Sequence, residues 1–286
     1  MKHLHLLAII SVFFVFQNNY AQWTKEKGNG YYKLSAWSLV ADEHYTSSGE
    51  IDPNATRGNF TLSFYGEYGI TDKIDVITYI PFFTRIYQNT QVSGTNGNVL
   101  QDGEAVNSIG DIDLGFRFAL LKKKKIAISS TIKFGLPTGK DKAGSDGSFQ
   151  TGDGEFNQLL TLNAGSSYKL FEKRSYAKAY LGFNNRTNNF SDEFHYGAET
   201  GIKLWDKFWL LGKLNAVKSL KNGSLSAQNT QGSIFANNVE YVSVAVEAAY
   251  YITKKLGVSF TYATAISGRI IYAQPSYSGG VFLDIK

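Results

Sequence analysis

The sequence contains no cysteine, which removes several classes of protein from consideration. Without cysteine the chain has no lipoprotein anchor, no disulfide framework, no thiolate metal site and no cysteine nucleophile. Histidine is also scarce: His3 and His5 lie at the extreme N-terminus, and only His44 and His195 follow. Two histidines are too few for a histidine-built zinc site. We therefore expect no metal centre of these types and no cofactor.

Long apolar runs and dense positive charge are missing as well. After residue 21 no stretch approaches the roughly 20 consecutive apolar residues of a transmembrane helix, which excludes a helical membrane protein. The net charge is a modest +5, and the four adjacent lysines at 122–125 are the main basic block. Because no basic face accompanies them, we interpret these lysines as a solvated turn and expect no nucleic-acid partner.

The N-terminus has the parts of a secretory signal peptide. Lys2 supplies a basic start, residues 6–16 (LLAIISVFFVF) are apolar, and the small residue Ala21 follows a short polar stretch. The apolar run is too short to span a bilayer as a helix. We predict a signal peptide over residues 1–21 and one domain over residues 22–286, with a buried N-terminal helix as the alternative.

Apolar and polar residues alternate through the rest of the chain with the period of two that a β-strand imposes. In residues 60–70 (FTLSFYGEYGI), Phe60 and Leu62 share one face, while Thr61 and Ser63 share the other. Most such segments have about 10–12 residues, the length of a tilted membrane-spanning strand. They lie at 30–39, 59–70, 74–86, 109–121, 126–136, 157–169, 176–186, 195–204, 208–218, 239–252, 256–267 and 276–286.

The lengths of the connections alternate too. After every second segment the connection is tight, as at 71–73, 122–125 and 206–207. The other connections are mostly long and polar, for example 41–58, 88–108, 137–156 and 219–238. Short periplasmic turns and long extracellular loops are typical of outer-membrane barrels, and an even strand number puts both termini in the periplasm.

These patterns predict an all-β fold, a transmembrane antiparallel up-and-down β-barrel of about 12 strands. The barrel would lie in the outer membrane, in contact with its lipid. It must close, because an open sheet edge in a bilayer leaves backbone groups unpaired. A soluble all-β fold, or a barrel of ten or fourteen strands, is the alternative. The sequence does not predict the oligomeric state.

One part of the chain resembles a known family. It reads GDIDLGFRFALL at 110–121, IAISSTIKFGLPTGKD at 126–141, TGDGEFNQLLTLNAG at 151–165 and YLGFNNR at 180–186. This resembles the outer-membrane barrel family named for the MetA pathway of phenol degradation, whose members are often called transporters. The resemblance covers about residues 60–286 and implies uptake of aromatic or other hydrophobic compounds.

The same family is a distant relative of the fatty-acid transporter type of barrel, which carries a long N-terminal plug. Here only about eight residues, 23–30, precede the first predicted strand. A segment of this length cannot fill a lumen, so any gate must come from infolded loops.

With the apolar faces turned outward, the inward faces carry charges of both signs and several aromatic rings. Buried charges must pair across the barrel or face water. Inward charges could select solutes and inward rings could stack on an aromatic solute. The residues that we expect to line the lumen and to select solutes are Asp111, Asp113, Arg117, Lys133, Arg85, Glu199, Lys203, Tyr79 and Phe83.

We expect an outer-membrane channel or transporter that passes small solutes, hydrophobic or aromatic ones among them, by passive diffusion. A non-transporting structural or surface-interaction barrel, with its lumen blocked by paired charges, is the alternative. An enzyme is not expected, and a lipid enzyme in a barrel is the least favoured alternative. His195 and Glu199 share a face but lie about 13 Å apart along a strand, and no G-x-S-x-G element is present.

Residues 134–156 contain two further patterns. FGLPTGKD, at 134–141, has the wrong spacing for a phosphate-binding loop, and Asp141 stands where serine or threonine would hold magnesium. We interpret it as a strand that leaves the membrane into an extracellular loop. Asp146, Asp153 and Glu155 follow among glycines, but their spacing matches no EF-hand. A solvated loop is favoured over a calcium site.

Overall fold

The computed structural model describes residues 24–123, 126–224 and 233–286, and the regular structure in these ranges is entirely β. No helix in this part of the chain is long and apolar enough to cross a membrane. The predicted signal peptide at 1–21 lies outside the described residues, as does part of the lysine turn at 122–125. The predicted domain is seen from Thr24 onward.

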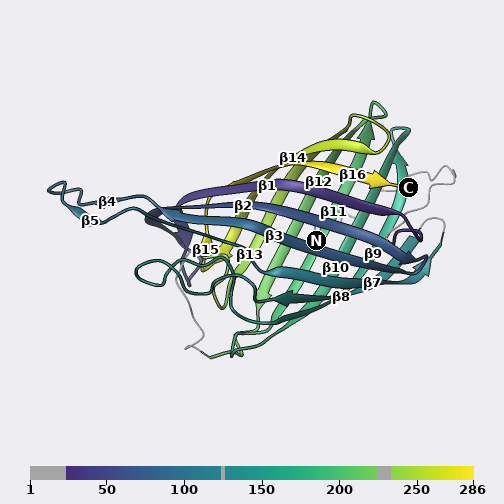
Figure 1. Cartoon of the computed structure of the whole chain (residues 1–286). Helices are drawn as coiled ribbons and strands as arrows, with labels where there is room; N and C mark the ends of the chain where they lie inside the picture. Colours follow the sequence, from purple (N-terminus) through teal and green to yellow (C-terminus); the bar gives the residue numbers. More distant parts are fainter. Residues whose placement is uncertain (1–23, 124–125, 225–232) are drawn as a thin grey trace, which may run out of the picture.

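Twelve long strands form one closed antiparallel barrel (Figure 1). Each strand pairs with the long strand before it and the long strand after it, and β1 pairs with β16 to close the sheet. The predicted up-and-down barrel is therefore confirmed. The long strands are β1 (Gly30–Tyr45), β2 (Ile51–Thr71), β3 (Ile74–Gln88), β7 (Ile112–Lys122), β8 (Ile126–Leu136), β9 (Asn157–Leu170), β10 (Lys173–Arg186), β11 (Glu193–Leu204), β12 (Phe208–Ser219), β13 (Glu240–Tyr251), β14 (Leu256–Arg269) and β16 (Ser276–Ile285).

Four short strands lie in the longer connections. β6 (Glu104–Ser108) pairs with β3, and β15 (Ile271–Tyr272) pairs with β1. β4 (Gln91–Val92) and β5 (Val99–Gln101) form a separate two-stranded sheet that projects from the barrel at the left of Figure 1.

The predicted long loop at 41–58 is mostly strand. Beyond a register shift between Ala41 and Glu43, β1 and β2 continue to pair as far as Tyr45 and Ile51. Alternation of apolar and polar residues marks only strand that faces lipid on one side. A hairpin that rises out of the apolar band keeps its backbone pairing without that signal, which is why the sequence pattern ended early.

The outer face of the barrel is apolar and the inner face is polar. Leu120 and Leu181 point outward and are 60% and 64% exposed, whereas Ser63 and Ser129 point inward and are nearly fully buried. A water-soluble protein buries its large apolar side chains. The reverse arrangement seen here fits a surface covered by lipid around a polar lumen.

The two ends of the barrel differ in their connections, and we call them the turn end and the loop end. At the turn end, Phe171 and Glu172 join β9 to β10, and Trp205 and Asp206 begin the turn from β11 to β12. All four residues have positive φ, between 46° and 59°, as a type I′ hairpin turn requires at its two central positions. Phe171 and Trp205 are 84% and 78% exposed, which suits aromatic residues at a membrane interface.

Replacing Leu181 with arginine tests the assignment of the outer face. We expect Leu181→Arg to destabilise the barrel in lipid vesicles by about 2–4 kcal/mol, because an arginine at the lipid-facing midplane loses its hydration. Denaturant titration of folded protein in vesicles measures this. Asn163→Arg, on the inward face of the neighbouring strand β9 and next to the residue opposite Leu181, is the matched control with a smaller expected loss. Equal losses for the two variants would contradict the assignment.

Candidate functional site

A belt of alternating charges follows the inner wall. This charge belt consists of Lys178, Glu199, Lys213, Glu247 and Lys33, carried in that order by β10, β11, β12, β13 and β1. Glu199 lies 3.0 Å from the Lys178 ammonium and 3.7 Å from that of Lys213. Glu247 lies 2.5 Å from Lys213 and 3.4 Å from Lys33. All these contacts except the last join adjacent strands, so the belt runs along the wall.

The contact between Lys33 and Glu247 spans two intervening strands, β16 and β14. Gly280 on β16 lies beneath the lysine, and a Cβ at this position would be 2.9 Å from Lys33 Cε. Gly280 is in register with another small residue, Ser259 on β14. The small residues leave room for the lysine stem to lie flat on the wall and reach the carboxylate.

A second charged cluster lies closer to the turn end. Arg117 on β7 donates to Glu67 on β2 at 2.9 Å and lies 3.5 Å from Asp75 on β3. Asp75 is fully buried and also accepts hydrogen bonds of 2.9 and 3.0 Å from the backbone amide of Lys25. The ammonium of Lys25 lies 3.6 Å from Asp284 on β16. Each carboxylate thus has donors that offset the cost of its burial.

The described N-terminal segment, residues 24–29, lines the inside of the turn end. The amide of Gly28 donates to the carbonyl of Gly69 on β2 at 2.9 Å. A Cβ on Gly69 would lie only 2.2 Å from the carbonyl oxygen of Glu26, so the segment is pressed against the wall. Only glycine permits so close an approach of two backbones.

At the loop end of β10, Arg186 is held by three carboxylates. Its guanidinium lies 2.6 Å from Glu155, 2.7 Å from Glu193 and 3.2 Å from Asp153. The Arg186 side chain is 5% exposed and that of Glu155 is fully buried. Asp153 and Glu155 belong to the connection 137–156, so the arginine fastens this loop to the barrel wall. We call these four residues the arginine clasp.

Asp111, just before β7, fastens the same loop at a second point. Its carboxylate accepts hydrogen bonds of 2.8 Å from the backbone amides of Gly139 and Asp153. A Cβ on Gly152 would lie 2.1 Å from Asp111 Oδ1, so the loop backbone closes tightly over the carboxylate. Burial, followed by the charge of Asp153, raises the pKa of Asp111 to about 7.

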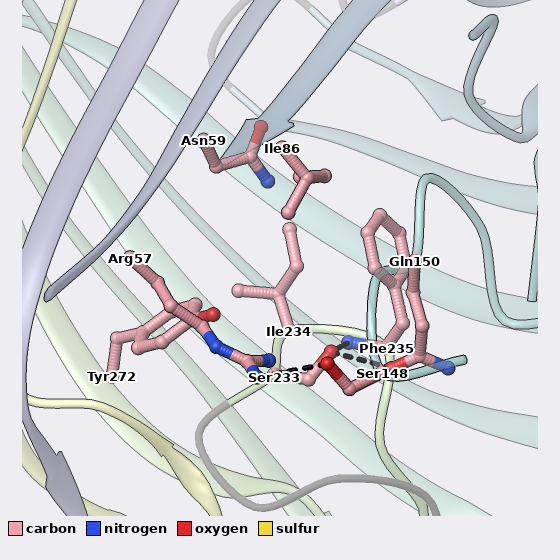
Figure 2. A pocket seen from close by; sticks show the side chains of 9 residues that line it. All are labelled: Arg57, Asn59, Ile86, Ser148, Gln150, Ser233, Ile234, Phe235 and Tyr272. Atoms are coloured by element: carbon pink, nitrogen blue, oxygen red, sulfur yellow. Dashed lines mark hydrogen bonds between the residues drawn. The ribbon is translucent and has the colours of Figure 1, made fainter. Parts of the chain in front are cut away.

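At the loop end the connection 137–156 contacts both β2 and the residues that precede β13 (Figure 2). Arg57 on β2 donates to Ser148 Oγ at 2.9 Å, and Ser233 Oγ donates to Gln150 Oε1 at 2.8 Å. The gap beside these contacts is about 10 Å³, enough for about one water molecule. These are the infolded loops that the short N-terminal segment leads us to expect.

A larger cavity of about 220 Å³, the loop-end chamber, lies between the barrel wall and residues 234–239, which precede β13. Its polar lining residues are Asp113, Lys133, Asp153, Asn157, Asn184, Arg186, Glu193 and His195. Its apolar lining residues are Leu159, Val217, Ile234, Ala236 and Val239, and Tyr241 also lines it. The chamber therefore presents both charged and apolar side chains to an occupant.

The structure places most of the predicted lumen residues on the inner face. Asp113 and Lys133, 2.7 Å apart on adjacent strands, line the loop-end chamber. Arg117 belongs to the turn-end cluster and Glu199 to the charge belt. Asp111 binds the loop 137–156 instead of lining the lumen.

Two further candidates face inward outside these clusters. Tyr79 on β3 is in register with Asp113. Lys203 shares the inward face of β11 with Glu199 and is in register with Trp209. Among the described residues, Lys203 forms no ion pair.

The structure places Phe83 and Arg85 on the outer face, against the prediction. The register of β3 against β2 shifts near Pro81, where β3 has one residue more than its partner. Proline lacks the N–H that a ladder needs, so it favours such a bulge. Beyond the bulge Thr84 points inward and is buried, whereas Phe83 lies opposite the outward Leu62.

The acidic loop also differs from the sequence interpretation. Asp153 and Glu155 are bound to Arg186 and are not solvated, because the loop folds back into the barrel. In the described ranges, no group of three or more His, Cys, Asp or Glu side chains is placed to hold a metal ion.

His195 contacts a different carboxylate from the one considered in the sequence. Its Nε2 lies 2.8 Å from Glu193 Oε2, while Glu199 belongs to the charge belt. Within the described chain His195 bonds no serine hydroxyl. The geometry around it therefore provides no serine hydrolase triad.

Comparison with known proteins identifies the fold. No family model matches the chain, and no curated protein matches it in sequence. An outer membrane channel from Pseudomonas putida F1 matches 93% of this chain and 98% of its own, with a TM-score of 0.59 at 13% identity. The NanC porin matches 89% of this chain and 99% of its own, with a TM-score of 0.50 at 5% identity. The translocator domain of the autotransporter NalP from Neisseria meningitidis matches 92% of this chain and 89% of its own, with a TM-score of 0.50 at 10% identity. At these identities the similarity shows the fold: that of outer-membrane barrels.

The loop 137–156 should open as the pH rises. The raised pKa of Asp111, about 7 against an ordinary 3.8, means that the closed loop holds a proton that the open loop releases. Closure is therefore favoured at low pH and is weakened as the pH climbs from about 4 through about 7. The rate at which a thiol reagent labels Thr151→Cys, at a buried position in this cysteine-free chain, measures opening.

Labelling of the exposed Asp102→Cys corrects for the intrinsic effect of pH on the reagent. We expect the corrected rate to rise with pH. Asp111→Asn keeps an acceptor oxygen but does not ionise, so the rise should shrink in that variant. An unchanged profile in Asp111→Asn would show that another group controls the loop.

Proposed function

We propose that this protein is an outer-membrane channel or transporter through which small solutes diffuse passively. The apolar outer face suits lipid, and the polar inner face suits water and solutes. In this proposal the turn end and both termini face the periplasm, and the longer connections face the cell exterior. The similarity to an outer membrane channel at a TM-score of 0.59 supports the assignment.

The observation that carries the proposal is that the inward charges pair along the wall. Asp113 and Lys133 lie on the adjacent strands β7 and β8, and Glu199 pairs with lysines on both neighbouring strands. From the sequence we expected these charges either to pair across the barrel, which would block it, or to face water. Pairing between neighbouring strands neutralises the buried charges and leaves space away from the wall, as the loop-end chamber illustrates.

The class of solute is proposed from the resemblance and from the inward tyrosines. The family named for the MetA pathway of phenol degradation implies hydrophobic or aromatic compounds. Tyr65 donates to Glu67 at 2.5 Å, and Tyr180 donates to Asn215 at 3.0 Å. Since these hydroxyls are bound to wall residues, the rings are held in place, and ring faces suit the stacking of an aromatic solute.

The predicted site residues take different roles in this proposal. Asp113 and Lys133 select solutes in the chamber, while Arg117, Glu199 and Lys203 set the charge of the lumen nearer the turn end. Tyr79 offers a ring to the solute. Asp111 acts indirectly, by positioning the loop 137–156. Phe83 and Arg85, on the outer face, take no part.

A non-transporting surface-interaction barrel is the second candidate, and two features favour it. The arginine clasp fastens a loop over the loop end, and the segment 24–29 lines the turn end. The hairpin of β4 and β5 projects beyond the barrel, where a partner could reach it (Figure 1). A barrel closed at both ends would carry no current.

Single-channel recording in a planar bilayer separates the two candidates. Refolded protein should give discrete ohmic current steps. In a salt gradient, Asp113→Asn should shift the reversal potential toward anion selectivity, because it leaves the Lys133 ammonium unpaired. Lys133→Gln should shift it the opposite way. Arg85→Gln removes a charge from the outer face and should change nothing.

The absence of current steps from a protein verified to be folded would reject the open channel and favour the surface-interaction barrel. Equal shifts in Asp113→Asn and Arg85→Gln would reject the assignment of Asp113 to the solute path.

A further inference from the structure

Three cations surround one carboxylate at the loop end of the barrel. Glu240, the first residue of β13, lies 2.6 Å from the Lys218 ammonium, 3.5 Å from the Arg269 guanidinium and 3.9 Å from the Lys221 ammonium. We call these four residues the outer basic cluster. The Glu240 side chain is 8% exposed, whereas the side chains of the three cations are 39–56% exposed. Three cations against one buried carboxylate leave two positive charges in excess at the surface.

The alternation of side chains places the cluster on the outer face. Val217 and Tyr241, the chain neighbours of Lys218 and Glu240, line the loop-end chamber inside the barrel. Since successive side chains of a strand point to opposite faces, Lys218 and Glu240 point outward. Arg269 on β14 is in register with Glu240 and points the same way.

Exposed aromatic rings show that the cluster lies at the edge of the apolar band. Lys218 is in register with Phe194 on β11, which is in register with Phe183 on β10. The two rings are 5.7 Å apart and both are exposed. Aromatic side chains on the outer face of a barrel form girdles at the membrane interfaces. The cations beside them therefore lie at the depth of the lipid headgroups.

The outer face below the cluster is apolar. Leu214 on β12, Val246 on β13 and Phe260 on β14 lie nearer the turn end and are exposed. A lipid whose acyl chains cover these side chains would bring its headgroup to the outer basic cluster. The three strands thus offer matching surface to both parts of an anionic lipid.

Neutralising Glu240 does not account for all three cations. Lys218 and Arg269 are the closer two, whereas Lys221 at 3.9 Å is beyond hydrogen-bond distance. Arginine and lysine are the side chains that bind phosphate oxygens, through charge-assisted hydrogen bonds. Basic residues beside a membrane surface also attract anionic lipids.

We infer that the outer basic cluster binds the phosphate headgroup of an anionic lipid in the outer leaflet of the membrane. Lys218, Lys221 and Arg269 donate to the phosphate oxygens, and the acyl chains pack on the apolar face of β12, β13 and β14. This inference goes beyond the proposed function. It takes from that proposal only the orientation, in which the loop end faces the cell exterior.

Native mass spectrometry of the refolded barrel in detergent tests the inference with three probes. They are lipid A, a glycolipid with two phosphates, the same glycolipid with both phosphates removed, and inorganic phosphate. We expect the phosphorylated glycolipid to bind at least about tenfold more tightly than the dephosphorylated one. Inorganic phosphate in tenfold molar excess should not displace it, because phosphate alone gains nothing from the apolar face.

Variants locate the site. Lys218→Gln combined with Lys221→Gln should weaken binding of the phosphorylated glycolipid by about tenfold or more. Arg269 still neutralises Glu240 in this double variant, so the barrel should fold. Lys254→Gln combined with Lys255→Gln makes the same change of net charge in an exposed turn at the opposite end and should leave binding unchanged.

Three results would overturn the inference. Equal binding of the two glycolipids would show that the phosphates are not recognised. Equal losses in the two double variants would show that net charge, and not the outer basic cluster, attracts the lipid. Displacement by inorganic phosphate would show a site for free phosphate in place of a lipid. Since binding is measured in detergent, none of these results depends on whether the barrel passes solutes.

Discussion

The pairing of β1 with β16, from Gly30 opposite Ile285 to Leu39 opposite Ser276, closes the sheet on itself. Closure satisfies the backbone of every long strand without an edge, which a bilayer demands. It also divides the side chains into an outer set that faces lipid and an inner set that the barrel wall encloses. The inner charges must therefore find partners among themselves, and the rest of the lumen follows from that requirement.

The partners are found along the wall at three levels. Near the turn end, Arg117 contacts Glu67 and Asp75, and Lys25 contacts Asp75 and Asp284. The charge belt follows, in which each glutamate lies between two lysines. At the loop end the balance changes, because Arg186 alone meets three carboxylates.

Much of the barrel could be predicted from the sequence because lipid enforces a simple period. Each of the twelve predicted segments became a long strand of the barrel, and the alternation assigned Asp113, Arg117 and Lys133 to the inside. The period fails where one residue is inserted, as at Pro81, after which Phe83 and Arg85 turn outward. The proline was visible in the sequence and could have warned of the bulge.

The structure of the loops was harder to predict, because no regular alternation of apolar and polar residues governs them. Asp153 and Glu155 look like solvated loop residues in the sequence, and only the path of the folded loop brings them to Arg186. Glu193 and Asn184 were missed for a related reason. Each stands at the loop end of a strand, next to residues that are distant in the chain. Lys25 was missed because a short polar segment before the first strand gives no sign that its backbone binds Asp75.

The central claim is that pairing along the wall leaves a passage through the barrel. Swelling of vesicles that contain the refolded protein, in isotonic solutions of neutral solutes of graded size, tests this most directly. The account predicts swelling with the smallest solutes that slows steeply with size, because infolded loops and the segment 24–29 narrow the two ends. Swelling no faster than in protein-free vesicles for every solute would contradict it and would mean that the paired charges and the loops fill the lumen.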